Sequence, residues 1–343
     1  MTGPRQLAWN WKPKAGHRVI RTIEMHTCGE PLRVIIDGLP KIEGQDVLAR
    51  RAYFRSHFDS LRTALMFEPR GHADMYGAVI SAGVNGADFE VFFLHNEGFS
   101  TMCGHAIIAL TKLVIEAGLI AGPAVTFDVP AGRIHARAEL DGDIVCRSIF
   151  RNVPSFVLHR DQQVAVPGLG PVRFDVAYGG AFYAIVDAQS LDVELSTKDY
   201  VRLIDYGRSI KQAVAAGFSI EHPFEPELSF LYGTIFTGPA EKQGHHSRNV
   251  CVFAEGEVDR SPTGSGVSAR AALHCARGDL ALGCPITIES ILGTCMTVTA
   301  LENAKYGSID AVIPEVSGSA FVTGANKFVF DPADPVRDGF ILR

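Results

Sequence analysis

Two stretches of the sequence share a layout that could do chemistry: the end of a strand, a short turn with glycine, and a helix of small residues. The first is GFSTMCGHAIIALTKLVIEAG, residues 98–118, and the second is VDRSPTGSGVSARAALHCARG, residues 258–278. The start of a helix presents unpaired backbone N–H groups and the positive end of the helix dipole, which suits a carboxylate. Two such helix starts that face each other would clamp one small carboxylate ligand.

The two turns differ in the residue that precedes the helix, which is Cys103 in the first and Thr263 in the second. Gly104 and Gly264 follow these residues, and glycine lets backbone approach a ligand closely. The helix dipole favours a thiolate, so the sequence predicts that the pKa of Cys103 is lowered from about 8.5. A cysteine near a helix start is also a common small core residue. The turn by itself leaves both interpretations open.

Other motifs offer weaker chemistry. GSGVSA, residues 264–269, matches the G-x-G-x-x-A pattern of dinucleotide sites, but DRSP separates it from the preceding strand. His245 and His246 are adjacent, yet the chain has no C-x-x-C and no H-E-x-x-H, so we expect a solvated loop and no metal. The stretch EPRGHADMYGA, residues 68–78, gathers charged and polar side chains that form either a wall of a site or a structural network.

Strands and helices must position the two turns. Runs rich in β-branched and aromatic residues dominate, and each is bounded by Gly, Pro or Asp. Helices are predicted across residues 44–65, after Cys103, across residues 197–217 and after Thr263. The layout repeats, which predicts two α+β units with a cleft between them. The first unit is residues 1–155 with Cys103, and the second is residues 156–324 with Asp259 and Thr263. The C-terminal strands near 325–343 are expected to pack back on the first unit.

The composition of the 343-residue chain excludes several classes of protein. A net charge of −6 without a basic stripe argues against a nucleic-acid partner. The N-terminus has no apolar signal region and no run of about 18 apolar residues occurs, so we expect neither export nor membrane insertion. Seven cysteines without a regular spacing fit reduced thiols. These features predict a cytoplasmic protein and leave its oligomeric state open, including a homodimer.

Five motifs taken together resemble the proline racemase family: MHTCGEPLRVI, EPRGHADMYGA, MCGHA, YGGAFYAIVDA and DRSPTGSG. They occur in the family's order and at similar spacing over most of the chain. The resemblance implies an α+β fold like that of diaminopimelate epimerase. In that fold two pseudo-symmetric α/β domains each wrap β-strands around a central helix, and the active site lies in the cleft between them. It also implies proton transfer at the Cα atom of proline-like amino acids, with no cofactor and no metal.

The second turn departs from the pattern of the family's racemases and epimerases, which place one cysteine on each side of the substrate. The first of these matches Cys103, but the second, usually in SPCGTG, is Thr263 here. A threonine hydroxyl titrates far above neutral pH and is a poor proton donor. The pairing of Cys and Thr is similar to that of the family's trans-3-hydroxy-L-proline dehydratases, in which one base suffices because the C3 hydroxyl leaves.

The resemblance therefore implies dehydration of trans-3-hydroxy-L-proline to Δ2-pyrroline-2-carboxylate, which tautomerises to Δ1-pyrroline-2-carboxylate. One alternative is a 4-hydroxyproline epimerase or proline racemase that uses Cys103 and a water. Another alternative is a catalytically weak protein that binds amino acids.

Matching the family's motifs residue by residue assigns further roles. Cys103 is the proton acceptor, and Asp259 holds the ring ammonium by a charge-assisted bond. The group that protonates the leaving hydroxide stays open among Thr263, His105 and a water. Cys28 stands where the family usually has Gly, and packing is favoured over a place at the rim of the site. The remaining implied contacts are the backbone of Gly104, His105, Gly264 and Ser265 with the substrate carboxylate, and the rings of Tyr76 and Phe253 as walls.

Overall fold

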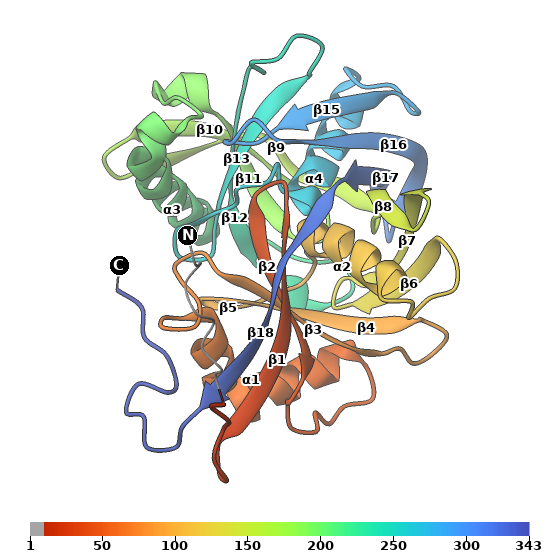
Figure 1. The fold of residues 1–343 in the computed structure, drawn as a ribbon. Coiled ribbons are helices and arrows are strands. Elements are labelled where there is room, and N and C mark those ends of the chain that lie inside the picture. The colour runs from red at the N-terminus through yellow and green to blue at the C-terminus, as the bar shows by residue number, and fades with distance from the viewer. Residues whose placement is uncertain (1–9, 343) are drawn as a thin grey trace, which may run out of the picture.

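The computed structural model describes residues 10–342 and contains a mixture of helices and strands (Figure 1). The α-helices are α1 (Val47–Met66), α2 (Gly104–Glu116), α3 (Tyr200–Gly217) and α4 (Gly264–Arg277), and the short 3-10 helices are η1 (Ala188–Leu191), η2 (Thr197–Asp199) and η3 (Pro226–Leu228). The earlier strands are β1 (Arg18–Thr27), β2 (Glu30–Asp37), β3 (Tyr76–Ala82), β4 (Phe89–His95), β5 (Gly98–Ser100), β6 (Ala124–Val129), β7 (Gly132–Asp141), β8 (Ile144–Arg151) and β9 (Ser155–Val166). The later strands are β10 (Gly170–Tyr178), β11 (Phe182–Asp187), β12 (Leu231–Gly238), β13 (Ser247–Phe253), β14 (Glu257–Val258), β15 (Pro285–Glu289), β16 (Cys295–Tyr306), β17 (Ile309–Gly318) and β18 (Ala320–Phe330).

The four predicted helices are present, each close to its predicted range. Helix α1 begins at Val47 because Asp46 caps it, its carboxylate accepting the Ala49 N–H at 2.8 Å. Its apolar residues recur on one face, where Phe54 and Leu65 are buried. The sequence pattern thus located the helices from local signals.

The strand pairings repeat between the two halves of the chain. In the first half β2 pairs parallel with β3, β3 antiparallel with β4, and β4 parallel with β6. In the second half β11 pairs parallel with β12, β12 antiparallel with β13, and β13 parallel with β15. The repeated topology supports the predicted pseudo-twofold pair of α+β units.

Strand pairings near the middle and the end of the chain connect its two halves. Strand β9 follows β8 but pairs antiparallel with β10, and β18 follows β17 but pairs antiparallel with β1 over its length. Strand β17 also pairs with β8, so the two halves share one hydrogen-bonded network. The domain boundary near residue 155, which divides the chain into residues 1–155 and 156–324, stays a prediction.

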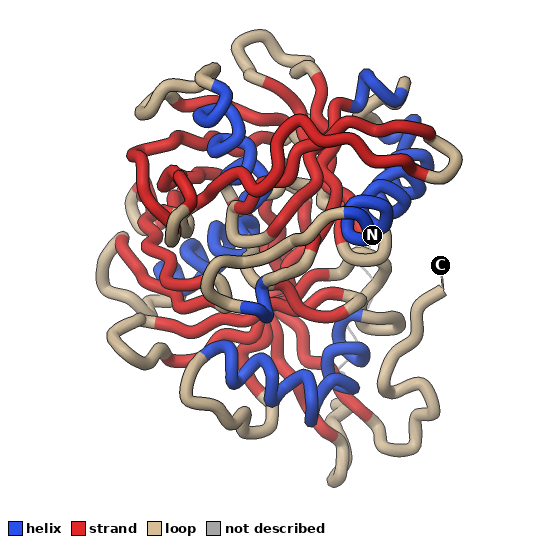
Figure 2. The backbone as a smooth tube through the Cα atoms, turned by 180° about the vertical axis from the view of Figure 1, so that it is seen from behind, coloured by secondary structure: helices blue, strands red, loops and turns tan. Residues whose placement is uncertain are grey.

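Helices α2 and α4 lie inside the strands, whereas α1 and α3 lie at the periphery of the molecule (Figures 1 and 2). Helix α2 packs against β1, β7, β8 and β18, and α4 packs against β9, β10, β16 and β17. Residues 106–110 of α2 are fully buried on every side, as expected for a helix that strands surround. Within the described part of the chain, no helix is long and apolar enough to cross a membrane.

Candidate active site

The N-termini of the two central helices meet at a pair of glycines. Cys103 is the N-cap residue of α2 and Thr263 is the N-cap residue of α4. A Cβ atom added to Gly104 would lie 2.6 Å from the Cα atom of Gly264, and one added to Gly264 would lie 2.6 Å from the Cα atom of Gly104. Only glycine allows this approach. The free N–H groups of both first turns therefore point into one small region.

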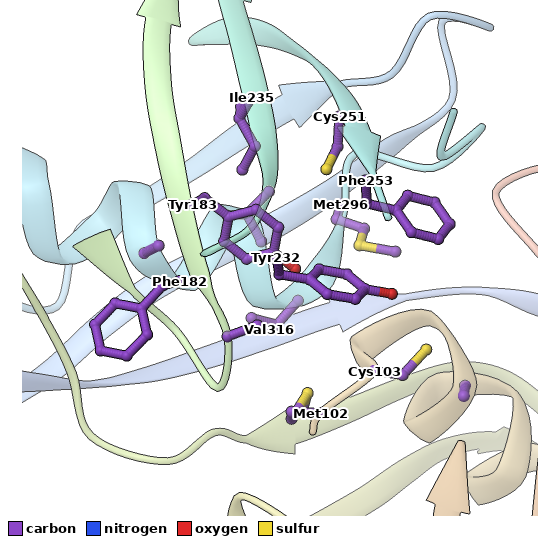
Figure 3. Close-up of a cluster of buried hydrophobic side chains, with 14 of the residues drawn as sticks. Met102, Cys103, Phe182, Tyr183, Tyr232, Ile235, Cys251, Phe253, Met296 and Val316 are labelled. Carbon is purple, nitrogen blue, oxygen red and sulfur yellow. The ribbon is translucent and has the colours of Figure 1, made fainter. Parts of the chain in front are cut away.

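A narrow cavity of about 20 Å³ lies at this meeting point. Figure 3 shows part of its wall, with Cys103 at the start of α2, Cys251 and Phe253 on β13, and the Tyr232 side chain reaching between them. All of the predicted site residues line it: Tyr76, Cys103, Gly104, His105, Phe253, Asp259, Thr263, Gly264 and Ser265. Five further residues line it: Glu30, Met102, Tyr183, Tyr232 and Cys251. The structure thus gathers residues from both halves of the chain around one narrow cavity.

The Cys103 thiol is buried, with only 4% of the residue exposed, and its Sγ atom lies 3.1 Å from Nδ1 of His105. Burial raises the pKa of Cys103 well above its usual value, although the Ala106 N–H and the Tyr76 hydroxyl act in the opposite direction. The prediction of a lowered pKa is therefore wrong, because desolvation of the thiolate outweighs the helix dipole. Burial also lowers the pKa of His105 to about 3, so its imidazole is neutral at pH 7.

Thr263 adopts an unusual backbone conformation with φ 68° and ψ 96°, which is strained for a β-branched residue. Its N–H donates to the Ser261 hydroxyl at 3.1 Å, which helps to hold the turn. The Thr263 hydroxyl is buried and has no hydrogen-bond partner among residues 10–342, yet it is close enough to lower the pKa of both Asp259 and Cys251. This hydroxyl is available to a ligand in the cavity.

The Asp259 carboxyl is buried at the cavity, where one oxygen accepts the Ser261 N–H at 2.7 Å. Burial raises the pKa of Asp259, and the hydrogen bonds from Ser261 and the nearby Thr263 hydroxyl oppose that rise. The hydrogen bonds favour the ionised form. Asp259 is therefore placed to meet a cationic group of a ligand.

Glu30, at the start of β2, is a second carboxyl at the cavity and was not among the predicted site residues. Its Oε2 atom accepts the Arg260 N–H at 2.7 Å, and its Oε1 atom is buried without a partner in the described structure. Burial raises the pKa of Glu30 well above its usual value, and the negative charge of Asp259 adds to the rise. The available signal was its position in MHTCGEPLRVI, residues 25–35, one of the motifs that carry the resemblance.

Cys251 is a second thiol at the cavity. It lies on β13, it is fully buried, and burial raises its pKa well above the usual value. In the sequence it looks like any core residue of a strand, so nothing in the local pattern distinguished it. The two paired turns contain one cysteine, whereas the cavity contains two.

Aromatic rings form much of the wall. Tyr76 packs edge-on against His105 with ring centroids 4.8 Å apart, and Tyr232 stacks on Phe253 at 5.3 Å. The Tyr183 hydroxyl lies 2.7 Å from Oγ of Ser265 and so ties β11 to the first turn of α4. These contacts hold the cavity in shape and exclude water from it.

The polar residues that precede Tyr76 in EPRGHADMYGA form a structural network outside the cavity lining. Arg70 lies over the Phe330 ring at 4.2 Å and donates to the carbonyl oxygens of Val329 and Arg337. Asp74 pairs with Arg260 at 2.8 Å, next to the turn that carries Asp259.

Cys28 packs in the interior, as favoured, with its thiol donating to the Cys295 carbonyl at 3.4 Å. His245 contacts the Glu289 carboxylate at 2.9 Å, while the adjacent His246 packs edge-on against His274 with ring centroids 4.8 Å apart. These contacts give both histidines structural partners.

Residues 22–341 match the family model described as proline racemase, and the chain belongs to that family. It is 50% identical over 341 residues to a trans-3-hydroxy-L-proline dehydratase of Colwellia psychrerythraea, an alignment covering 97% of this chain and 96% of the relative. It is 43% identical over 331 residues to a 3-hydroxyproline 2-epimerase of Burkholderia multivorans, covering 95% and 99% respectively.

A crystal structure of a hydroxyproline epimerase from Agrobacterium vitis with bound trans-4-OH-L-proline superimposes with a TM-score of 0.89. That protein is 30% identical, and the match covers 95% of this chain and 96% of the epimerase. The expected α+β fold of the family, with two domains, is confirmed.

Proposed function

We propose that this protein is a trans-3-hydroxy-L-proline dehydratase, a hydro-lyase that forms Δ1-pyrroline-2-carboxylate and water. The observation that carries the proposal is the asymmetry of the two helix starts. A thiol, Cys103, caps one helix and a hydroxyl, Thr263, caps the other. The Colwellia psychrerythraea relative, which bears the name of this activity, supports the same function.

The substrate is held by its two charged groups. Its carboxylate lies between the helix starts, where the N–H groups of Gly104, His105, Gly264 and Ser265 and both helix dipoles favour negative charge. Its ring ammonium pairs with Asp259 in a charge-assisted bond. With both ends fixed and the ring enclosed by Tyr76 and Phe253, the Cα–H bond is directed at Cys103.

Cys103 then acts as the base. The thiol has a raised pKa in the ligand-free site, but the ammonium that the substrate brings favours the thiolate. The electron pair left on Cα then forms the double bond to C3, and the C3–O bond breaks. The product of this step is the enamine Δ2-pyrroline-2-carboxylate, which tautomerises to the imine.

Inversion at Cα requires a second proton donor on the opposite face of the ring. The Thr263 hydroxyl is too weak an acid for that role. The competing candidate is a 2-epimerase, since the Burkholderia multivorans relative bears that name and Cys251 adds a second thiol to the cavity. Elimination is favoured because the residue at the second helix start is threonine.

The reaction consists of proton transfers and one C–O cleavage, so it needs no electron carrier. With reduced thiols, we propose that the enzyme works in the cytoplasm on a hydroxyproline-like amino acid. A homodimer is compatible with the proposal and is tested by sizing the protein in solution. A catalytically weak binding protein would retain the clamp without turnover.

The test is incubation of the protein with trans-3-hydroxy-L-proline, trans-4-hydroxy-L-proline and L-proline in D₂O. We expect a cyclic imine from the first substrate, and no deuterated amino acid inverted at Cα from any of them. Rapid accumulation of inverted amino acid would identify an epimerase or racemase. Binding without imine or inversion would identify a binding protein, and either outcome would end the proposal.

A further inference from the structure

The Glu30 side chain presents an unsatisfied oxygen at the cavity. The residue is 0% exposed, and the Arg260 N–H occupies only its Oε2 atom. The Oε1 atom is buried and has no hydrogen-bond partner within residues 10–342. A buried polar oxygen without a partner is costly. Such an atom at the wall of a cavity indicates that a ligand completes its hydrogen bonding.

The groups that influence the pKa of Glu30 differ from those that influence the pKa of Asp259. The charged groups that act on Glu30 are Asp259, Asp74 and Arg260, and burial is the largest influence on its pKa, which is raised. Asp259 is also buried but accepts hydrogen bonds from Ser261 that favour its ionised form. Burial raises the pKa of both carboxyls, and the negative charge of Asp259 raises the pKa of Glu30 further. Because the Ser261 hydrogen bonds stabilise a charge on Asp259, Glu30 is the carboxyl of the two that is better placed to keep a proton.

The stereochemistry of the substrate restricts where the acid can lie. In trans-3-hydroxy-L-proline the C3 hydroxyl and the carboxylate lie on opposite faces of the ring, so the hydroxyl shares a face with the Cα hydrogen. The departing hydroxyl is consequently on the face that Cys103 addresses. Thr263 begins the opposite helix and addresses the other face. The neutral His105, with a pKa of about 3, has only the weakly acidic proton of an uncharged imidazole to give.

The connections of Glu30 place it with the Cys103 half of the site. It opens β2, directly after the hairpin from β1, and Thr27 of that hairpin donates to the His105 carbonyl at 2.7 Å. The hairpin thus ties Glu30 to the helix start that carries the base.

We propose that Glu30, which lines the same cavity as Cys103 and Asp259 and has an Oε1 atom without a partner in the described structure, is the general acid that protonates the departing C3 hydroxyl. The inference rests on the proposed dehydratase function. In the step, the Cα proton moves to Sγ of Cys103 and its electron pair forms the new double bond. The electron pair of the C3–O bond leaves with the oxygen, which takes the Glu30 proton and departs as water. The thiol then loses a proton to solvent and the Glu30 carboxylate regains one, which restores the enzyme.

A change of leaving group tests this role. Fluoride departs without a proton, so trans-3-fluoro-L-proline needs the base but not the acid, and it yields the same enamine and imine. In Glu30→Gln the amide oxygen can still accept the Arg260 N–H, but no proton can be transferred. We expect kcat/KM for loss of water to fall by about 10²–10⁴-fold, and kcat/KM for loss of fluoride to fall by less than about tenfold.

Solvent exchange gives a second readout on the same variant. Cys103 still removes the Cα proton, so Glu30→Gln incubated with trans-3-hydroxy-L-proline in D₂O should return substrate that carries deuterium at Cα without inversion. Glu30→Asp, which keeps an acid on a shorter side chain, should recover part of the lost dehydration. The matched control is Glu90→Gln on β4, a carboxyl that is 2% exposed and lies outside the cavity lining. It should leave the ratio of the two eliminations unchanged.

Each outcome separates this inference from the proposed function. Equal losses for water and fluoride in Glu30→Gln would mean that Glu30 binds substrate or supports the fold, and would overturn the acid role. If kcat/KM fell for loss of water but not for loss of fluoride in Tyr232→Phe, and not in Glu30→Gln, the acid would be Tyr232, which also lines the cavity. Failure of the wild-type protein to form imine from either substrate would instead refute the dehydratase function.

Discussion

Substitution of Gly264 by alanine should disrupt the carboxylate site between the two helix starts. The expected loss of activity can be worked out from the structure. The added Cβ atom would lie 2.6 Å from Cα and 3.1 Å from the carbonyl carbon of Gly104, whereas ordinary contact begins at 3.4 Å. Both obstructing atoms are backbone, so no change of rotamer relieves the clash. The two helix starts must move apart by about 1 Å, and a displacement of that size costs roughly 10²-fold in rate where groups are positioned for catalysis.

The same displacement sets the expected loss of stability. Overpacking of this kind costs about 1–3 kcal/mol. With an unfolding entropy of about 2.1 cal/mol/K per residue, a chain of 343 residues should lose about 1–4 °C in Tm. The protein should therefore remain folded at 25 °C while kcat/KM for trans-3-hydroxy-L-proline falls about 10²-fold.

The assays are steady-state kinetics of imine formation and thermal unfolding followed by circular dichroism. Gly217→Ala at the end of α3 is the control, because its Cβ atom would meet only Val164 at 3.9 Å. That variant should keep wild-type kinetics. Wild-type kcat/KM in Gly264→Ala would show that the contact between the helix starts does not form the carboxylate site, and the reasoning above would be refuted.

Other changes probe the remaining groups. Cys103→Ala should abolish both imine formation and Cα exchange in D₂O with the fold intact by circular dichroism, and near-normal dehydration would remove Cys103 as the base. Thr263→Cys should add measurable racemisation of L-proline, scored by chiral chromatography, and its absence would argue that residue 263 does not face Cα. Pyrrole-2-carboxylate, which mimics the flattened Cα, should inhibit and should slow alkylation of Cys103; alkylation at an unchanged rate would place that thiol away from the ligand. Because the pKa of Glu30 is raised in the folded state, its contribution to stability is present at low pH and is lost as pH rises through the folded pKa. The Tm of Glu30→Gln relative to wild type should therefore increase as pH is raised above about 4.5, and a constant difference would contradict the raised pKa.

Local patterns in the sequence determined the helices and the two turns, and the resemblance to the family supplied the predicted residues of the cavity wall. Helix α1 follows from the spacing of Phe54 and Leu65 and from the Asp46 cap, all within a few turns of chain. The facing helix starts follow from the repeated order of strand, glycine turn and helix around Cys103 and Thr263. These features are predictable because short-range hydrogen bonding and hydrophobic periodicity produce them.

Tertiary structure alone decided the register in which β18 pairs with β1 and the presence of Glu30 and Cys251 at the cavity. Glu30 reaches the site through the Arg260 N–H, a contact between positions 230 residues apart that no local pattern encodes. The direction of the Cys103 pKa shift was predicted wrongly for a related reason. The helix dipole is a local property that the sequence reveals, whereas burial depends on how distant strands close over the thiol, and desolvation is the larger effect.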